Sequence, residues 1–296
     1  MPIKLDHQLR EQITHEPAAF PITFFEGELA NLHNWAGPLH WHPEFEIATA
    51  ESGTLAFQVG QQHLTLEAGS SILINGNMLH GIKQVFGETP DPMPNIVFFG
   101  TVIAPETSAI YQKYIRPISE CDILPFVIFG RDESWHRKVN DLMEDIYRHL
   151  RKHDDCYEMI VQRDLNMIFE SLYRHFDTLP KSRVTRIQIN SQIRIQQMLT
   201  YIYEHYSEAV TLSDIARAAN ISRSEAGRCF NTYMGCSPID ALIQYRLQTA
   251  RSLLMHTNLT LEEISHACGF NSVNYFSRQF RRAYDYAPSQ NRHLGK

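Results

Sequence analysis

The chain has 296 residues, which is long for one compact domain and sufficient for two domains with separate cores. Hydrophobic residues make up 43% and charged residues 20%, and without an export leader or a run of eighteen apolar residues we expect a cytoplasmic protein with no membrane partner. The net charge of −6 is uneven: residues 1–186 carry 16 basic and 25 acidic side chains, whereas residues 187–296 carry 11 and 8, so a polyanionic partner would bind the C-terminal third.

The first part of the chain shows the pattern of an all-β domain. Residues 20–104 consist of short apolar or alternating runs about ten residues apart, such as FEIATAES, GTLAFQVG and QHLTLEAG, separated by Gly, Pro and Asn. Evenly spaced short strands of this kind predict a barrel or a sandwich. We therefore assign residues 1–133 to a β-barrel domain.

A stretch rich in histidine and carboxylate, HWHPEFEIATAESG at residues 40–53, lies within this domain. Side chains alternate between the two faces of a strand, so His40, His42 and Glu46 point the same way if the chain is extended. Their spacing resembles the first metal-binding motif of cupin proteins, H-x-H followed by a glutamate and a glycine. The later segment NGNMLH resembles the second motif, with two asparagines in place of its Pro and Gly and with His80 at the ligand position.

Three interpretations of these four side chains stay open: a metal site, a metal-free effector pocket, or a hydrogen-bonded interior cluster. Three imidazoles and one carboxylate suit Zn²⁺, Fe²⁺, Mn²⁺ or Ni²⁺ and do not distinguish among them. Trp41, between the two histidines, and Trp35 are further pocket candidates, because an indole can stack on a sugar ring or an aromatic effector. The motif alone also fits a cupin-type metalloenzyme, such as a dioxygenase or an isomerase.

Beyond the barrel the spacing of apolar residues changes to that of helices. We expect two amphipathic helices within residues 134–178, and each could pack against its own barrel or against a second copy of the chain. Residues 179–192 contain a proline and several cations without a clean period, and they form the predicted linker.

The C-terminal segment, residues 193–296, contains an internal repeat. TLSDIARAANIS and TLEEISHACGFN align at an offset of 49, and the later triplets RCF and RQF align at an offset of 50. Each copy opens with a threonine followed three residues later by an acid, which is the pattern of a capping box at a helix start. Asn220 and Gly269 suit the left-handed end of that helix, and Ser222 and Asn271 are the expected caps of a second one. The repeat therefore predicts two helix-turn-helix units.

A long helix is expected between the two units. The stretch PIDALIQYRLQTARSLLMHT begins at Pro238, a residue favoured in the first helical turn. A helix of about twenty residues spans roughly 30 Å. It could hold the two units close to the ~34 Å that separates successive major-groove faces on one side of B-DNA.

The stretch ISHACGFNSVNYFSRQFRRAYDYAPSQNR at residues 264–292 resembles the signature of the AraC/XylS transcriptional regulators. The resemblance covers about residues 193–292 and implies a domain that binds double-stranded DNA. The chain departs from the signature at Ser265, where Ala is usual, at Asp285, where Gly is common, and at Asn291, where Tyr is common.

The resemblance places the DNA-reading residues on the second helix of each unit. Arginine can clamp guanine, asparagine can pair with adenine, and valine can touch a thymine methyl group. Gly227 offers no side chain, so we expect the first unit to read DNA mainly through Arg228. The candidate contacts are Arg223, Ser224, Glu225, Gly227 and Arg228 in the first unit, and Val273, Asn274, Ser277 and Arg278 in the second.

The resemblance also implies an overall organisation. The fold class is α+β multidomain, in which a cupin-like sensor barrel is followed by amphipathic helices and by an all-α double helix-turn-helix domain. The function implied is that of a ligand-responsive activator, with a carbohydrate as the first candidate effector, RNA polymerase as a partner, and a homodimer formed through residues 134–178. We expect no enzymatic activity; the alternative is a cupin-type metalloenzyme with a helical appendage.

Overall fold

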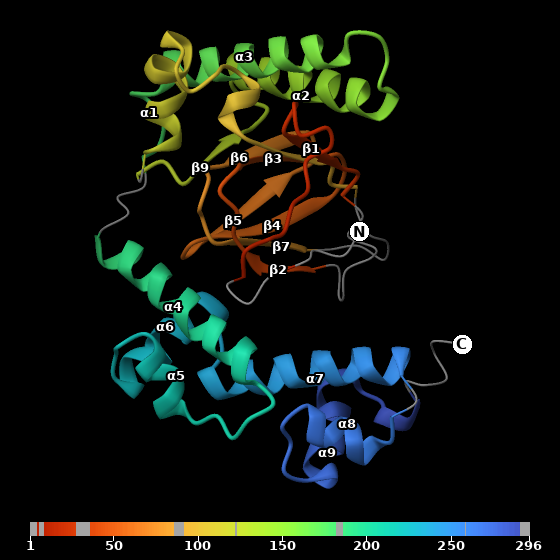
Figure 1. The fold of residues 1–296 in the computed structure, drawn as a ribbon. Helices are drawn as coiled ribbons and strands as arrows, with labels where there is room; N and C mark the ends of the chain where they lie inside the picture. The colour runs from red at the N-terminus through yellow and green to blue at the C-terminus, as the bar shows by residue number, and fades with distance from the viewer. Residues whose placement is uncertain are drawn as a thin grey trace. The chain divides into compact units, whose positions relative to one another are not determined.

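The computed structural model describes residues 5, 9–27, 36–85, 92–121, 123–181, 186–257 and 259–290 (Figure 1). The chain divides into two compact units, Met1–Gln188 and Ile189–Lys296, and the division falls inside the segment predicted as a linker. Within the described part of the chain, none of the helices combines the length and apolar character needed to span a bilayer. Trp35 and Asn291 lie outside the described residues.

The first unit is built on two antiparallel sheets, in agreement with the predicted barrel or sandwich. In spatial order, the five-stranded sheet consists of β1 (Ile22–Phe25), β8 (Asn95–Phe98), β3 (Phe45–Ala50), β6 (Ser70–Ile74) and β9 (Phe126–Phe129). The four-stranded sheet consists of β2 (Ala36–His40), β7 (His80–Gln84), β4 (Thr54–Val59) and β5 (Gln62–Glu67).

The apolar pattern of the strands explains how the sheets pack. In β4 half-buried residues alternate with the buried residues Leu55, Phe57 and Val59. Strand β3 is buried along its whole length because both of its faces are covered. Its Ala48 belongs to the core between the sheets, whereas Phe45 and Ile47 belong to a second core beneath the helices. Glu46 follows the alternation of Ala48 and points into the barrel.

Two long helices cover the outer face of the five-stranded sheet, as Figure 1 shows. They are α2 (Ser134–Lys152) and α3 (Tyr157–His175), which confirms the two predicted helices. The Tyr147 hydroxyl of α2 lies 2.9 Å from Oγ1 of Thr49 in β3, which fixes the helix on the sheet. The inward-facing apolar residues of α2 and α3 are therefore covered by their own barrel.

The helix α4 (Arg186–His205) begins inside the predicted linker of residues 179–192. The prediction of an irregular segment is wrong for the second half of this range. Arg, Gln and Ile are compatible with a helix even without a clean apolar period, and buried residues further along, Ile195, Met198 and Ile202, anchor α4 in the second unit.

The second unit contains the two predicted helix-turn-helix motifs. They are α5 (Leu212–Ala218) with α6 (Arg223–Met234), and α8 (Leu261–Ala267) with α9 (Val273–Tyr284). Both predicted capping boxes are present, and Asn220 and Gly269 take the left-handed conformation with φ of 53° and 73°.

One predicted cap is wrong. Ser222 caps α6, but α9 is capped by Ser272 rather than by Asn271. The turn between α8 and α9 holds one residue more than the turn between α5 and α6. The offset between the two motifs is therefore 49 in their first helices and 50 in their second helices. The additional residue shifts the cap from Asn271 to the next residue.

The helix α7 (Pro238–His256) joins the two motifs and packs against both (Figure 1). Its first residue is Pro238, as predicted, and Ser237 forms a capping box with Asp240. Near its other end Ala250 and Leu254 form a core with Phe276 and Phe280 of α9. With 19 residues at about 1.5 Å each, α7 spans roughly 28 Å.

Candidate functional site

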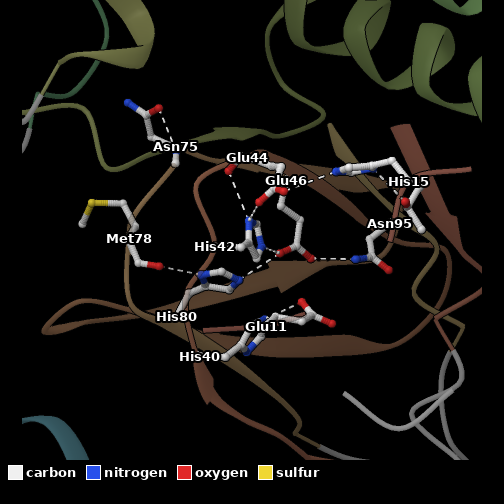
Figure 2. Close-up of polar contacts among 12 residues, drawn as sticks. Glu11, His15, His40, His42, Glu44, Glu46, Asn75, Met78, His80 and Asn95 are labelled. Atoms are coloured by element: carbon white, nitrogen blue, oxygen red, sulfur yellow. Dashed lines mark hydrogen bonds and ion pairs between the residues drawn. The ribbon is translucent and has the colours of Figure 1, made fainter. Parts of the chain in front are cut away.

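The four predicted histidine and glutamate side chains come together inside the barrel. His40 ends β2 and pairs in register with His80, the first residue of β7, while Glu46 comes from β3 of the other sheet. All four residues are buried, and one potential ligand atom from each lies within 4.8 Å of the others (Figure 2). The four side chains meet as their spacing predicted, but the expectation of one extended strand is wrong: β2 ends at His40, His42 lies in the loop that follows, and Glu46 belongs to β3.

Hydrogen bonds to the backbone orient the three imidazoles. Nδ1 of His40 lies 2.8 Å from the carbonyl oxygen of Pro38, and Nδ1 of His80 lies 2.8 Å from that of Met78. Nδ1 of His42 lies 3.2 Å from the carbonyl oxygen of Glu44. Because a carbonyl oxygen can only accept, each Nδ1 donates its proton and each Nε2 is turned toward the centre of the cluster. Histidines that bind metals are oriented in the same way.

The Glu46 carboxylate contacts two of these Nε2 atoms. Oε2 is 2.9 Å from Nε2 of His80 and 3.3 Å from Nε2 of His42, and Oε1 accepts a 2.8 Å hydrogen bond from the Asn95 amide. Burial alone would raise the pKa of Glu46, but the bonds from His42 and His80 outweigh it and hold the pKa well below its usual range. A carboxylate oxygen and an Nε2 lone pair cannot bond directly, so each contact requires a proton or a cation between the two atoms.

The structure adds a residue that the sequence did not reveal. Glu11 reaches the cluster from an N-terminal segment, and its Oε2 lies 3.5 Å from Nε2 of His40. Burial, followed by repulsion from Glu46, raises the pKa of Glu11 to about 7, and burial lowers the pKa of His40 to about 3. No motif marks Glu11, because it lies 29 residues before His40 in a stretch without a clear pattern.

The second unexpected carboxylate is Glu44. Its Oε1 lies 3.3 Å from Nε2 of His15, and its Oε2 lies 3.6 Å from Nδ1 of His42 (Figure 2). Burial would raise the pKa of Glu44, but the contacts from His15 and its own backbone prevail and lower it. The predicted pocket residue Trp41 is half-buried, and the guanidinium of Arg10 lies 5.8 Å from the centre of its ring.

The predicted DNA-reading residues lie on α6 and α9, and most of them are exposed. The exposed side chains include Arg228 of α6 and Arg278 of α9, which occupy equivalent positions in the two motifs. The Arg278 guanidinium lies 5.4 Å from the centre of the Tyr275 ring, a cation–π contact that restricts its orientation. A Cβ added at Gly227 would meet no atom within 4 Å. Exposed with the two arginines are Arg223, Ser224 and Asn274, while Val273 and Ser277 are half-buried.

Glu225 is positioned differently from its neighbours. Its carboxylate forms an ion pair with Arg194 of α4, and its backbone N–H donates to the capping Ser222. Both groups are about two-thirds buried, with 32% and 35% of their side chains exposed. The Glu225 side chain is thus engaged inside the domain and fastens α6 to α4.

Two family profiles match the sequence. One, described as a helix-turn-helix domain, matches residues 215–293, and the other, described as a cupin domain, matches residues 32–90.

Similarity to curated proteins extends over most of the chain. The chain is 32% identical over 261 residues to the HTH-type transcriptional activator RhaS of Citrobacter koseri, with 86% of each protein covered. It is 26% identical over 287 residues to the uncharacterized HTH-type transcriptional regulator YdeC of Bacillus subtilis, with 96% of each covered. It is also 26% identical over 183 residues to the lactose operon transcription activator of Staphylococcus xylosus, with 62% of this chain and 64% of that protein covered.

Proposed function

Because the chain belongs to the AraC family of DNA-binding transcriptional regulators, we propose that its barrel senses a small-molecule effector and thereby controls how its double helix-turn-helix domain binds DNA. The relatives are transcriptional regulators, which confirms the predicted class of protein and argues against the metalloenzyme alternative. The effector, the residues that touch DNA and the mode of assembly are parts of the proposal.

The observation that carries the proposal is the equivalent placement of two exposed arginines. Arg228 and Arg278 project from the second helices of the two motifs, and α7 joins these motifs over roughly one turn of duplex. An arginine can form two hydrogen bonds to N7 and O6 of guanine, which reads a base directly. We therefore assign base contacts to these arginines, assisted by Arg223 and Ser224 in the first motif and by Val273, Asn274 and Ser277 in the second.

Two other predicted contacts receive different roles. Glu225 is held by Arg194, so we assign it to the structure of the domain rather than to a base. Gly227 has open space around its Cα, so the backbone of α6 can approach the DNA closely at this point.

The buried cluster is the proposed centre of the sensor. The inward Nε2 atoms of His40, His42 and His80, with the ionised Glu46, fit a divalent cation such as Zn²⁺, Fe²⁺, Mn²⁺ or Ni²⁺. A bound cation would neutralise the buried carboxylate and would offer an open position to an oxygen of the effector. Because one relative is named for the lactose operon, a carbohydrate is the first candidate effector, and Trp41 a candidate for stacking against it.

The assembly proposed is a homodimer that activates transcription. The inner faces of α2 and α3 cover the barrel, but α3 also exposes large apolar side chains on its outer face: Met159, Met167 and Tyr173 are 71%, 46% and 38% exposed. A second copy of the chain would cover them. Since two of the relatives are named activators, we expect contact with RNA polymerase and a cytoplasmic location with the DNA.

The test is selection of bound DNA from a random library by the purified protein, with and without a pool of sugars. We expect one enriched sequence with two parts about one helical turn apart, and an affinity for it that changes when the correct sugar is present. Selection without enrichment would contradict the assignment of the reading residues. If a sequence is enriched but no sugar changes the affinity for it, a carbohydrate effector is refuted.

A further inference from the structure

The N-terminal segment places a carboxylate beside the histidine cluster. The backbone N–H of Glu11 donates to the carbonyl oxygen of Trp41 over 2.9 Å, and the N–H of Trp41 donates to the carbonyl oxygen of Leu9 over 3.0 Å. Trp41 lies between His40 and His42 in sequence. This pairing therefore sets the register of Glu11 against the two histidines, and the Glu11 side chain, 11% exposed, reaches the cluster as Figure 2 shows.

The separation of Glu11 and His40 is that of two groups that bind one ion between them. Nδ1 of His40 donates to Pro38, so Nε2 of the neutral imidazole is an acceptor; when Glu11 is ionised, its Oε2 is a second acceptor that faces this Nε2 at 3.5 Å. This separation is long for a hydrogen bond. Two ligands that each lie about 2.1 Å from one ion are about 3.0 Å apart at right angles and about 3.4 Å apart at the tetrahedral angle.

The other contacts in the cluster fall in the same range. Nε2 of His80 and of His42 lie 2.9 Å and 3.3 Å from Oε2 of Glu46. Glu11 thus contacts His40, and Glu46 contacts His42 and His80; each of these contacts has the spacing of two ligands on one ion.

We propose that Glu11 is a further ligand of the cation in the barrel, so that the donor set contains three imidazole nitrogens and two carboxylate oxygens. This inference rests on the cation site proposed above. Five protein donors exceed the four of a closed tetrahedral zinc site, and added carboxylate favours ions that accept oxygen-rich, six-coordinate sites. The set therefore shifts the preference of the site from four-coordinate Zn²⁺ toward Mn²⁺ or Fe²⁺, and ion binding fastens the segment around Glu11 to Trp41, which follows the end of β2.

The experiment compares the full-length wild type with Glu11→Gln, which keeps the shape of the side chain and removes its charge. Glu16→Gln is the matched control, because it makes the same change at an exposed position of the same segment. Binding of Mn²⁺ is followed by the paramagnetic resonance signal of the free ion, and binding of Zn²⁺ by competition with a chromophoric chelator. We expect Glu11→Gln to weaken Mn²⁺ binding at least tenfold and Zn²⁺ binding less, and Glu16→Gln to change neither.

A second readout does not depend on affinity. Mn²⁺ should slow hydrogen exchange of the Glu11 and Trp41 amides in the wild type and leave it unchanged in Glu11→Gln. If Glu11→Gln binds Mn²⁺ as tightly as the wild type while His80→Ala loses it, the cation site stands and the role of Glu11 is refuted. If the wild type binds neither ion, the cation site itself is refuted, and the role of Glu11 with it.

Discussion

Nε2 of His80 lies 2.9 Å from Oε2 of Glu46, and the two buried residues come from different sheets of the barrel. The contact joins β7 to β3 across the interior, where a charge can be maintained only if it is neutralised. Any occupant of the cluster, whether a proton, a cation or a group of the effector, therefore acts on the two sheets at once. This property makes the cluster a suitable centre for a sensor.

The raised pKa of Glu11 predicts a dependence of stability on pH. Glu11 faces His40 and lies near Glu46, His80 and Glu44, and its pKa rises from 4.5 to about 7 on folding. An acid with a raised pKa in the folded state stabilises the fold below its unfolded pKa and loses that contribution as the pH rises through the folded value.

We therefore expect the free energy of unfolding of the wild type, relative to that of Glu11→Gln, to decrease as the pH rises from 4.5 to 7 in the presence of a chelator. At about 1.4 kcal/mol per pKa unit, the loss is up to about 3 kcal/mol. Urea unfolding at a series of pH values measures it. Parallel curves for the two proteins would show that the Glu11 carboxyl keeps its ordinary pKa.

Ser265, which stands where the family signature has Ala, predicts a stabilising substitution. Its side chain is completely buried in α8, and its Oγ has no hydrogen-bond partner among the described residues. A buried hydroxyl without a partner costs about 1–3 kcal/mol, so Ser265→Ala should raise the free energy of unfolding by about 1 kcal/mol. Ser272→Ala is the contrasting control, because it removes the cap of α9 and should lower stability by about 1 kcal/mol. A destabilised Ser265→Ala would refute the unpaired state of this hydroxyl.

Asp285, another departure from the signature, ends α9 with a φ of 63°. At the equivalent end of α6, Gly235 has the same φ. This left-handed conformation costs about 1 kcal/mol for a residue with a side chain and nothing for glycine. We expect Asp285→Gly to raise the midpoint of thermal unfolding and Gly235→Ala to lower it. Equal midpoints for Asp285→Gly and the wild type would mean that the aspartate is not strained there.

The exposed apolar side chains of α3 predict the dimer contact. If a second copy covers Met159 and Met167, replacing both by glutamate places charges in that contact and should convert the dimer to a monomer. Sedimentation velocity measures the change. Met255→Glu, at an exposed methionine of α7, is the control and should leave the oligomeric state unaltered. A doubly substituted protein that still sediments as a dimer would assign the contact to another surface.

The sequence was most informative where local chemistry decides the structure. The capping boxes at Thr211 and Thr260 and the left-handed ends at Asn220 and Gly269 depend on a few adjacent residues, and they were predicted correctly. The histidine cluster followed from the motif spacing, although its residues lie on two sheets and the loop between them rather than on one extended strand. In contrast, Glu11 reaches the cluster only through tertiary pairing with Trp41, for which no spacing rule exists.

Other features depended on packing that a pattern does not contain. The contact of Glu225 with Arg194 requires α4 to lie beside α6, so a residue predicted to contact DNA is held within the domain. The additional residue in the second turn moved the cap from Asn271 to Ser272. The first residues of α4 were assigned to the linker because the buried residues that anchor this helix lie beyond that segment.

Arg228 and Arg278, at equivalent positions of the two motifs, are the residues proposed to read DNA. The affinity of Arg228→Ala and Arg278→Ala for the selected sequence, measured by fluorescence anisotropy, tests this role, with Arg116→Ala in the first unit as a control at an exposed arginine. Loss of a bidentate contact to guanine costs about 1–3 kcal/mol, so each variant should bind about 5-fold to 150-fold more weakly and should discriminate less at one base. Wild-type affinity and unchanged base preference in both variants would contradict this role.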